Sequence, residues 1–222
     1  MSRFVATAVI AFLLAACGRT KAGIDVEFAI TQLNDKSDQV RADAARRLGE
    51  SADPRAVEPL LAALNDRYSN VQDAASDSLG KLKGERTVDL TIAFMQKNHG
   101  NSAAIAAARA LGKLGDRRAV ESLFNAAHVN PIFSIARPAA AALGQLGDRS
   151  VVERVMPELE HQDPVVRSSA VMMLGWMKDP RAYEPLAATL LNDSDEKVRE
   201  EAAIALGNLG HGQPIGPSFN TT

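Results

Sequence analysis

The chain has one cysteine, few aromatic residues and no excess of either charge, and each shortage excludes a class of protein. Cys17 is the single Cys, which excludes an intramolecular disulfide framework and any metal site built from several cysteines. Lys and Arg number 25 against 27 Asp and Glu, a balance that argues against a basic surface for nucleic acid. Aromatic residues make up only 5% of the 222 residues, whereas 38 are Ala. Because Ala is the best helix former and has little bulk, this composition favours closely packed helices.

Residues 1–16 have the pattern of an export signal. One basic residue, Arg3, precedes an apolar stretch that is shorter than the roughly 20 residues of a membrane-spanning helix. The stretch ends in Leu14-Ala15-Ala16-Cys17-Gly18, which resembles the lipobox of bacterial lipoproteins. That resemblance implies cleavage before Cys17, followed by acylation of its sulfur and its new amine. The alternative is an ordinary cleaved signal or an uncleaved anchor with an incidental cysteine.

The expected anchor places the protein at a membrane of the cell envelope. Two or more acyl chains hold a protein stably on a bilayer, whereas one gives marginal binding. Gly18, and not Asp, follows Cys17. By resemblance to lipoproteins of bacteria with two membranes, this implies the outer membrane, with the protein facing the periplasm. Residues 17–23 would then be the lipidated Cys and a short tether.

The rest of the chain is built from one sequence repeat. A Leu-Gly dipeptide recurs at spacings of 31, 32, 32, 31 and 32 residues, and an Ala-Ala pair precedes most copies. The six copies are Leu48-Gly49, Leu79-Gly80, Leu111-Gly112, Leu143-Gly144, Leu174-Gly175 and Leu206-Gly207. A regular period of this length is typical of repeat proteins that stack helical units. The Gly costs about 1 kcal/mol against Ala inside a helix, so we expect close packing or a helix end at each copy.

Each repeat predicts two helices. Helix A closes on Leu-Gly, and helix B follows a turn in which an Asp, as in Asp53-Pro54-Arg55, caps the new helix. The apolar residues of helix B lie 0, 3, 4 and 7 residues from the first one, as in Val57, Leu60, Leu61 and Leu64. This spacing places them on one face of a helix.

The ends of the repeat array set the expected domain boundaries. Residues 24–35 read as a lone helix B, and the array ends with a helix A at residue 210. We therefore expect about twelve helices over 24–210, with a disordered tail over 211–222 that is rich in Gly and Pro. Pro138 lies inside the fourth helix A and predicts a kink there.

The repeat resembles the short HEAT repeats first noted in phycobilisome lyases, and the resemblance covers residues 24–210. It implies an all-α fold, a right-handed α-α superhelix or HEAT-repeat solenoid. In this architecture no unit can bury its apolar face alone, so neighbouring units share one continuous core. The resemblance further implies that A helices line the convex face and B helices the concave face.

The charged residues that recur in the repeat have a structural explanation. Arg41, Arg167 and Arg199 share one position, and Asp residues precede the A helices at Asp35, Asp66, Asp163 and Asp193. Resemblance to the family implies that these residues cap helices and form Arg–Asp ladders between repeats. Gln72, Ala104 and Ala136 replace the Arg in the second, third and fourth repeats, so any ladder should be interrupted there.

Three apolar residues depart from the repeat pattern and are our candidates for binding a partner. Phe133 lies in a turn, where surface residues are usually polar. Trp176 stands in a column whose other members are polar, and Met172 replaces residues that are mostly polar or small. Trp is enriched at the centres of protein interfaces, whereas Met commonly fills gaps in a core. Packing into the solenoid is the alternative for all three.

Two enzyme classes share this repeat, but the sequence predicts the catalytic site of neither. Deoxyhypusine hydroxylases bind two irons with His-Glu pairs, but no His in this chain is followed by Glu. Phycobilin lyases resemble the chain in the repeat alone. We therefore expect no metal, no cofactor and no catalysis, with an enzyme of either type as the alternative. The favoured hypothesis is a membrane-anchored HEAT-repeat scaffold or adaptor in the bacterial cell envelope, which binds an unknown protein partner and no nucleic acid.

Overall fold

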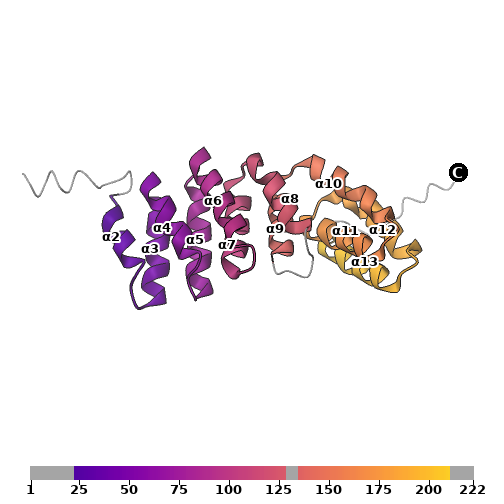
Figure 1. Ribbon diagram of the computed structural model, residues 1–222, viewed down its shortest axis with the longest axis horizontal. Coiled ribbons are helices and arrows are strands. Elements are labelled where there is room, and N and C mark those ends of the chain that lie inside the picture. Colours follow the sequence, from indigo (N-terminus) through magenta and orange to yellow (C-terminus); the bar gives the residue numbers. More distant parts are fainter. Residues whose placement is uncertain (1–22, 129–134, 211–222) are drawn as a thin grey trace, which may run out of the picture. The chain divides into compact units, whose positions relative to one another are not determined.

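The computed structural model describes residues 23–128 and 135–210, which form twelve α-helices and four short 3-10 helices with no strand among them (Figure 1). The expected all-α fold of about twelve helices is therefore confirmed. The chain divides into two compact units, and the boundary between Ser122 and Leu123 falls inside one helix. Each unit is described by itself.

The first unit holds three and a half helix pairs. Its elements are α2 (Val26–Gln32), α3 (Asp38–Glu50), η1 (Pro54–Ala56), α4 (Val57–Ala63), α5 (Ser69–Lys81), α6 (Glu85–Lys97), α7 (Ser102–Leu114), η2 (Arg117–Ala119) and the start of α8 (Val120–His128). The second unit holds the rest of α8, then α9 (Ala136–Leu146), α10 (Arg149–Val155), η3 (Met156–Glu160), α11 (Pro164–Met177), η4 (Pro180–Ala182), α12 (Tyr183–Asn192) and α13 (Glu196–Leu209).

Four helices of type B pack mainly on the helix of type A that follows them. In the first unit α2 packs on α3, α4 on α5 and α6 on α7, and in the second α12 packs on α13. The A helices also stack on one another, α3 on α5 and α5 on α7 in one unit, and α9 on α11 and α11 on α13 in the other (Figure 1). The first helix, which the sequence predicted to stand alone, is thus half of a complete pair.

The turns between helices follow the predicted capping pattern. The side chains of Asp53, Asp116, Asp148 and Asp179 each accept a hydrogen bond from the backbone N–H two residues later, at 2.8–3.0 Å. These bonds satisfy N–H groups that the first turn of a helix leaves without a partner.

The kink predicted at Pro138 is wrong. Helix α9 begins at Ala136, so Pro138 lies in its first turn. A proline there removes an N–H that has no partner inside the helix in any case, and the helix continues without interruption to Leu146.

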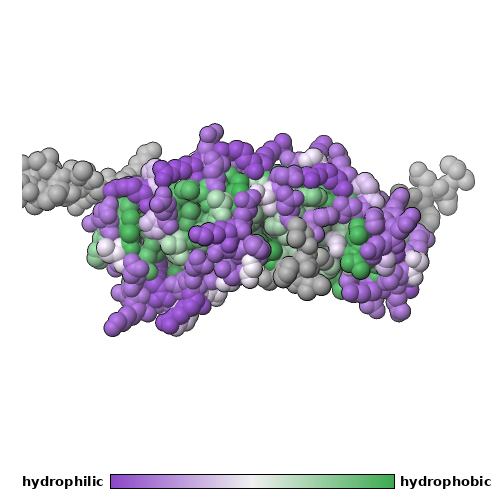
Figure 2. All heavy atoms as spheres, viewed as in Figure 1, coloured by the Kyte–Doolittle hydropathy of each residue, from purple (hydrophilic) through white to green (hydrophobic). Residues whose placement is uncertain are grey.

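The small residues of the repeat lie where A helices approach one another. A Cβ atom added to Gly49 would lie 2.5 Å from the Cβ of Ser78 on α5, and one added to Gly175 would lie 2.6 Å from the Cβ of Ala205 on α13. The Leu of every dipeptide except Leu206 is fully buried. The expected close packing is confirmed. On the face that Figure 2 shows, hydrophilic residues cover most of the helices, and hydrophobic residues show between them.

Candidate functional site

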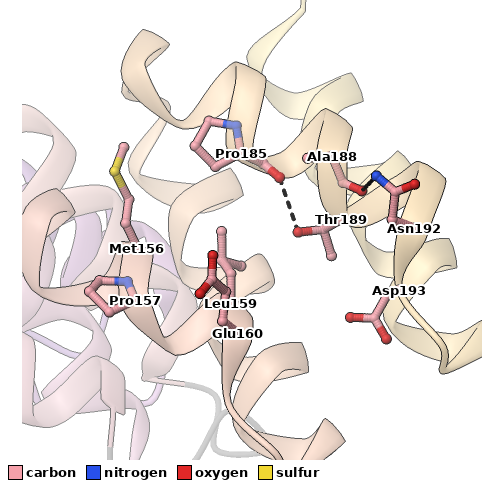
Figure 3. A pocket seen from close by; sticks show the side chains of 9 residues that line it. All are labelled: Met156, Pro157, Leu159, Glu160, Pro185, Ala188, Thr189, Asn192 and Asp193. Carbon is pink, nitrogen blue, oxygen red and sulfur yellow. Dashed lines mark hydrogen bonds between the residues drawn. The ribbon is translucent and has the colours of Figure 1, made fainter.

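A groove between η3 and α12 is a cavity of the second unit. Its volume is about 620 Å³, within the range of sites that hold small molecules or a few side chains of a partner (Figure 3). Nine residues line it: Met156, Pro157, Leu159, Glu160, Pro185, Ala188, Thr189, Asn192 and Asp193. The first four come from η3 and the others from α12 and the residue after it.

Pro157 shapes one wall of this groove. Helix α10 ends at Val155, and the chain tightens at once into the 3-10 helix η3, with Pro157 in its first turn. Proline at this point cannot donate the hydrogen bond that would continue an α-helix. The fifth helix B is therefore half α-helix and half 3-10 helix, and its C-terminal half faces α12 across the groove.

The walls combine apolar and polar side chains, and two of the polar ones bond to their own helix. Thr189 donates its hydroxyl to the carbonyl of Pro185 at 3.0 Å, and Asn192 donates its amide to the carbonyl of Ala188 at 3.1 Å (Figure 3). Leu159 and Thr189 are buried, whereas Ala188 is exposed. The groove thus offers apolar contacts beside polar and charged groups.

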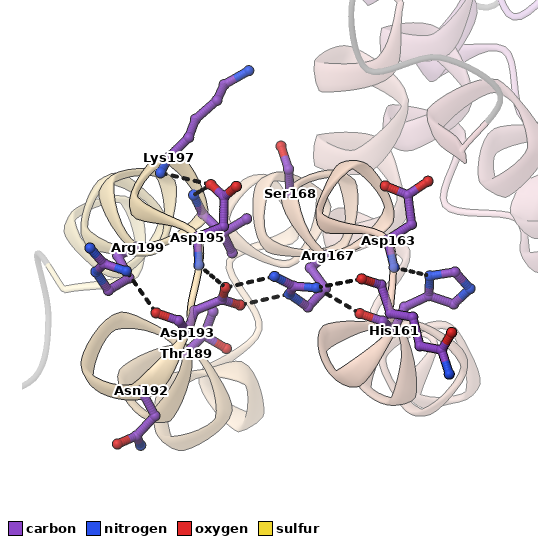
Figure 4. A network of polar contacts seen from close by, with 12 residues as sticks. His161, Asp163, Arg167, Ser168, Thr189, Asn192, Asp193, Asp195, Lys197 and Arg199 are labelled. Carbon is purple, nitrogen blue, oxygen red and sulfur yellow. Dashed lines mark hydrogen bonds and ion pairs between the residues drawn. The ribbon is translucent and has the colours of Figure 1, made fainter.

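Two carboxylates line the groove and have different surroundings. Asp193 accepts two hydrogen bonds from Arg167, from Nε and Nη2, both at 2.8 Å (Figure 4). These bonds hold the pKa of the Asp193 carboxyl below its ordinary value, although its partial burial acts in the opposite direction. Glu160 is exposed and has no ion-pair partner within residues 23–128 and 135–210. Glu160 is therefore the carboxylate that a bound partner could pair with.

The Arg167–Asp193 pair belongs to the predicted ladder between repeats. Arg41 binds Asp66 in the same way, at 2.6 and 2.9 Å, and its hydrogen bonds lower the pKa of that carboxyl. The Nη1 atoms of Arg41 and Arg167 donate to backbone carbonyls of their own repeats. Gln72, which replaces Arg in the second repeat, donates instead to the backbone carbonyl of Asp66. Both the ladder and its interruption at Gln72 are confirmed.

The predicted partner-binding residues lie outside the groove. Met172 and Trp176 are four residues apart on α11, so they share one face of that helix, and both are half-buried. Phe133 and the predicted lipidation site Cys17 lie outside the described residues. Reasoning from the repeat columns missed the groove, although Pro157 and Pro185 within two neighbouring B segments were a usable signal.

The remaining chemistry of the described residues is limited. Within their two ranges, no cluster of three or more His, Cys, Asp or Glu side chains could hold a metal ion. His128 stacks on Phe124, with ring centroids 5.1 Å apart, and its Nε2 lies 3.6 Å from a carboxylate oxygen of Glu158. No helix between residues 23 and 210, residues 129–134 set aside, has both the length and the apolar character needed to cross a membrane.

The stacked helix pairs, the Leu-Gly columns and the Arg–Asp ladder define an α-solenoid repeat protein. The family model for HEAT repeats matches residues 26–105 and 133–207, and the model for the PBS lyase HEAT-like repeat matches residues 103–126. The chain belongs to the HEAT-repeat family. A search of the curated proteins found no match.

Solved structures with similar folds come from several sources. One is the CpcE–CpcF complex of phycocyanin lyase from Nostoc sp. PCC7120, with 22% identity, coverage of 94% of this chain and 91% of that chain, and a TM-score of 0.43. Human deoxyhypusine hydroxylase in complex with glycerol has 18% identity, coverage of 90% and 88%, and a TM-score of 0.37. The archaeal HEAT-like repeats protein from Thermococcus onnurineus NA1 has 16% identity, coverage of 84% and 80%, and a TM-score of 0.40.

Proposed function

We propose that this protein is a lipid-anchored HEAT-repeat adaptor of the cell envelope, whose groove between η3 and α12 holds a segment of a partner protein. The observation that carries the proposal is the groove itself, a cavity of about 620 Å³ that is lined by both apolar and polar residues, among them the exposed Glu160. The anchor is the expected acylated Cys17, at the end of the apolar segment over residues 1–16.

The chemistry of the groove indicates what the partner segment carries. Pro185, Leu159 and Met156 offer apolar contact to an aliphatic or aromatic side chain. Between residues 135 and 210 there are twelve acidic residues against eight basic ones, which favours the approach of a basic segment. A Lys or Arg next to the apolar side chain would pair with Glu160. The partner segment is therefore apolar with flanking basic residues.

Filling the groove tests the proposal. Ala188 is exposed on α12 and faces the groove, so Ala188→Trp should occupy the apolar surface without disturbing the core. Ala62 holds the same repeat position on α4 and is also exposed, which makes Ala62→Trp the matched control. We expect Ala188→Trp to weaken recovery of the partner from membranes at least about tenfold, with Ala62→Trp unchanged. Equal recovery with both variants would show that the groove is not the binding site.

Charge reversal gives a second test of the same site. Glu160→Lys should weaken binding and reduce its dependence on salt, because the proposed ion pair across the rim becomes a repulsion. Glu196→Lys is the control, since Glu196 is exposed at the start of α13 and does not line the groove. If both variants weaken binding equally, general acidity and not the groove attracts the partner.

A further inference from the structure

The last A helix, α13, keeps the surface that the other A helices use to bind the next repeat. Its exposed residues Ala203 and Gly207 occupy the positions of Ala45 and Gly49, which are buried in α3. A Cβ atom added to Gly207 would have no neighbour within 4 Å, whereas one added to Gly49 would clash with α5. Ile204, beside this surface, is 65% exposed. Among the described residues, α13 therefore lacks the polar outer face that usually closes a solenoid.

The ladder of arginines is also incomplete at this end. In Arg41 and Arg167, Nη1 donates to a carbonyl of the same repeat, while Nε and Nη2 hold the Asp carboxylate of the next repeat. Arg199 makes the first of these contacts, from Nη1 to the carbonyl of Asp193 at 2.7 Å. Figure 4 shows Arg199 on the side of Asp193 away from Arg167. Among the described residues, Nε and Nη2 of Arg199 have no hydrogen-bond partner.

The first repeat carries the matching groups. Asp35 holds the position of Asp66 and Asp193, but no repeat precedes it within the described residues, and its exposed carboxylate accepts one hydrogen bond, from the N–H of Ser37. A second ion pair between repeats shows the same relationship. Asp73 on α5 pairs with Arg109 on α7. Glu200 on α13 holds the repeat position of Asp73, and Arg46 on α3 holds that of Arg109.

We infer that this protein self-associates head to tail, with α13 of one copy packing on the first repeat of the next. Arg199 of one copy would hold Asp35 of the next, and Glu200 would pair with Arg46, in the arrangement that the repeats use inside the chain. At Gly207, the backbone of α13 would lie close to Arg47 of the next copy. A basic side chain is compatible with such a contact, because Lys113 lies against Gly80 and still reaches Asp77 at the surface.

The faces that would meet are different, and this fixes the kind of assembly. The outer face of α3 carries Arg46 and Arg47, whereas the outer face of α13 is apolar around Gly207. A contact between unlike faces leaves one of each free in every complex, so copies can continue to add. The assembly would therefore grow with concentration and would not stop at a dimer.

Charge exchange between copies tests this inference. The full chain with Cys17→Ser, held in mild detergent, should show by light scattering a protein mass that rises with concentration above the 23.6 kDa of one chain. Arg199→Glu and Asp35→Lys should each weaken association at least about tenfold. An equimolar mixture of the two variants should recover it, because the carboxylate introduced in one copy would meet the ammonium introduced in the other, while the remaining Arg199 and Asp35 would make the original contact and let the two variants alternate. Arg117→Glu, an exposed change away from both faces, should have no effect.

Cysteine pairs identify which faces meet. In the Cys17→Ser chain, a copy with Arg199→Cys should form a disulfide with a copy carrying Asp35→Cys, and each variant alone should form none. Disulfides between two Arg199→Cys copies would show a symmetric contact and overturn the inference. A wild-type mass equal to one chain at every concentration would also overturn it, as would association that appears only after residues 211–222 are deleted, since the tail would then be the occupant of this face. Circular dichroism on every variant checks that the helices are retained.

Discussion

Arg167 and Asp193 join consecutive repeats through two parallel hydrogen bonds of 2.8 Å, and both side chains are largely buried, at 11% and 5% exposure. Arg41 and Asp66 repeat the arrangement in the first unit. A guanidinium that donates two parallel hydrogen bonds to a carboxylate fixes the relative orientation of the two side chains more strictly than apolar packing does. The pairs therefore set the register between neighbouring helix pairs.

The ladder makes stability depend on pH. Hydrogen bonds from arginine lower the pKa of Asp66 and Asp193 in the folded chain, so the folded state binds these protons less readily than the unfolded state. Their stabilising contribution is present above the ordinary pKa of about 4 and is lost as the pH falls through the lowered folded value. We expect Arg167→Gln to reduce the melting temperature at pH 7, and the difference from wild type to shrink steadily below about pH 4.

Arg117→Gln is the control for this measurement, because Arg117 is exposed and takes no part in the ladder. Its melting temperature should follow that of the wild type at every pH. A difference between Arg167→Gln and wild type that is the same at pH 7 and at pH 2 would show that the ion pair is not the source of the pH dependence.

The glycines of the Leu-Gly pairs give a prediction about packing. Gly175→Ala should destabilise the folded chain by about 1–3 kcal/mol, because the new Cβ would lie 2.6 Å from the Cβ of Ala205 and 2.7 Å from its Cα. Gly207→Ala places a methyl group in open space and should stabilise the helix by up to about 1 kcal/mol. Urea unfolding of dilute protein measures both values. Equal effects of the two substitutions would contradict the packing of α13 on α11.

Trp176 and Met172 remain candidates for partner contact. We expect Trp176→Ala to reduce recovery of the partner several-fold, with a smaller effect from Met172→Ala, while the melting temperature changes little. Trp176 is half-buried, so its ring has exposed surface to offer. The measurement is partner recovery at equal amounts of folded protein, with melting recorded in parallel. A large loss of stability with unchanged recovery would make Trp176 a packing residue.

Cys17 gives the prediction about anchoring. Cys17→Ser should abolish incorporation of labelled fatty acid and retention in the membrane fraction, because lipidation of this sulfur is the proposed anchor. A salt wash removes copies that are retained through protein contacts alone. Retention of the washed variant as a labelled lipoprotein would contradict the proposal.

Local patterns in the sequence predicted the repeat, because the residues that define a helix pair are close together in the chain. The Leu-Gly columns, the capping Asp residues and the break in the ladder at Gln72 all follow from positions read off one repeat and compared with the next. The pairing of the first helix could not be read in this way. Whether a helix B packs on the helix A before it or after it depends on which face each one turns, and α2 packs on α3.

The groove and the straight course of α9 at Pro138 could not be predicted from local sequence patterns. The groove needs the 3-10 segment at Pro157 to lie opposite α12, a relationship between two segments about thirty residues apart. The kink depends on where α9 begins, and a shift of that start to Ala136 places Pro138 in a turn that tolerates it. Both outcomes depend on tertiary packing, which the period of the repeat does not specify.

Photo-crosslinking from the groove is the measurement that tests the proposed function most directly. A photoreactive amino acid at Ala188, in the full chain within intact membranes, should crosslink to one protein through a segment in which Lys or Arg flanks an apolar residue. The same amino acid at Ala62, the matching exposed position on α4, should not give that product. Identical products from both positions, or a crosslinked segment that is acidic, would contradict a partner-binding groove between η3 and α12.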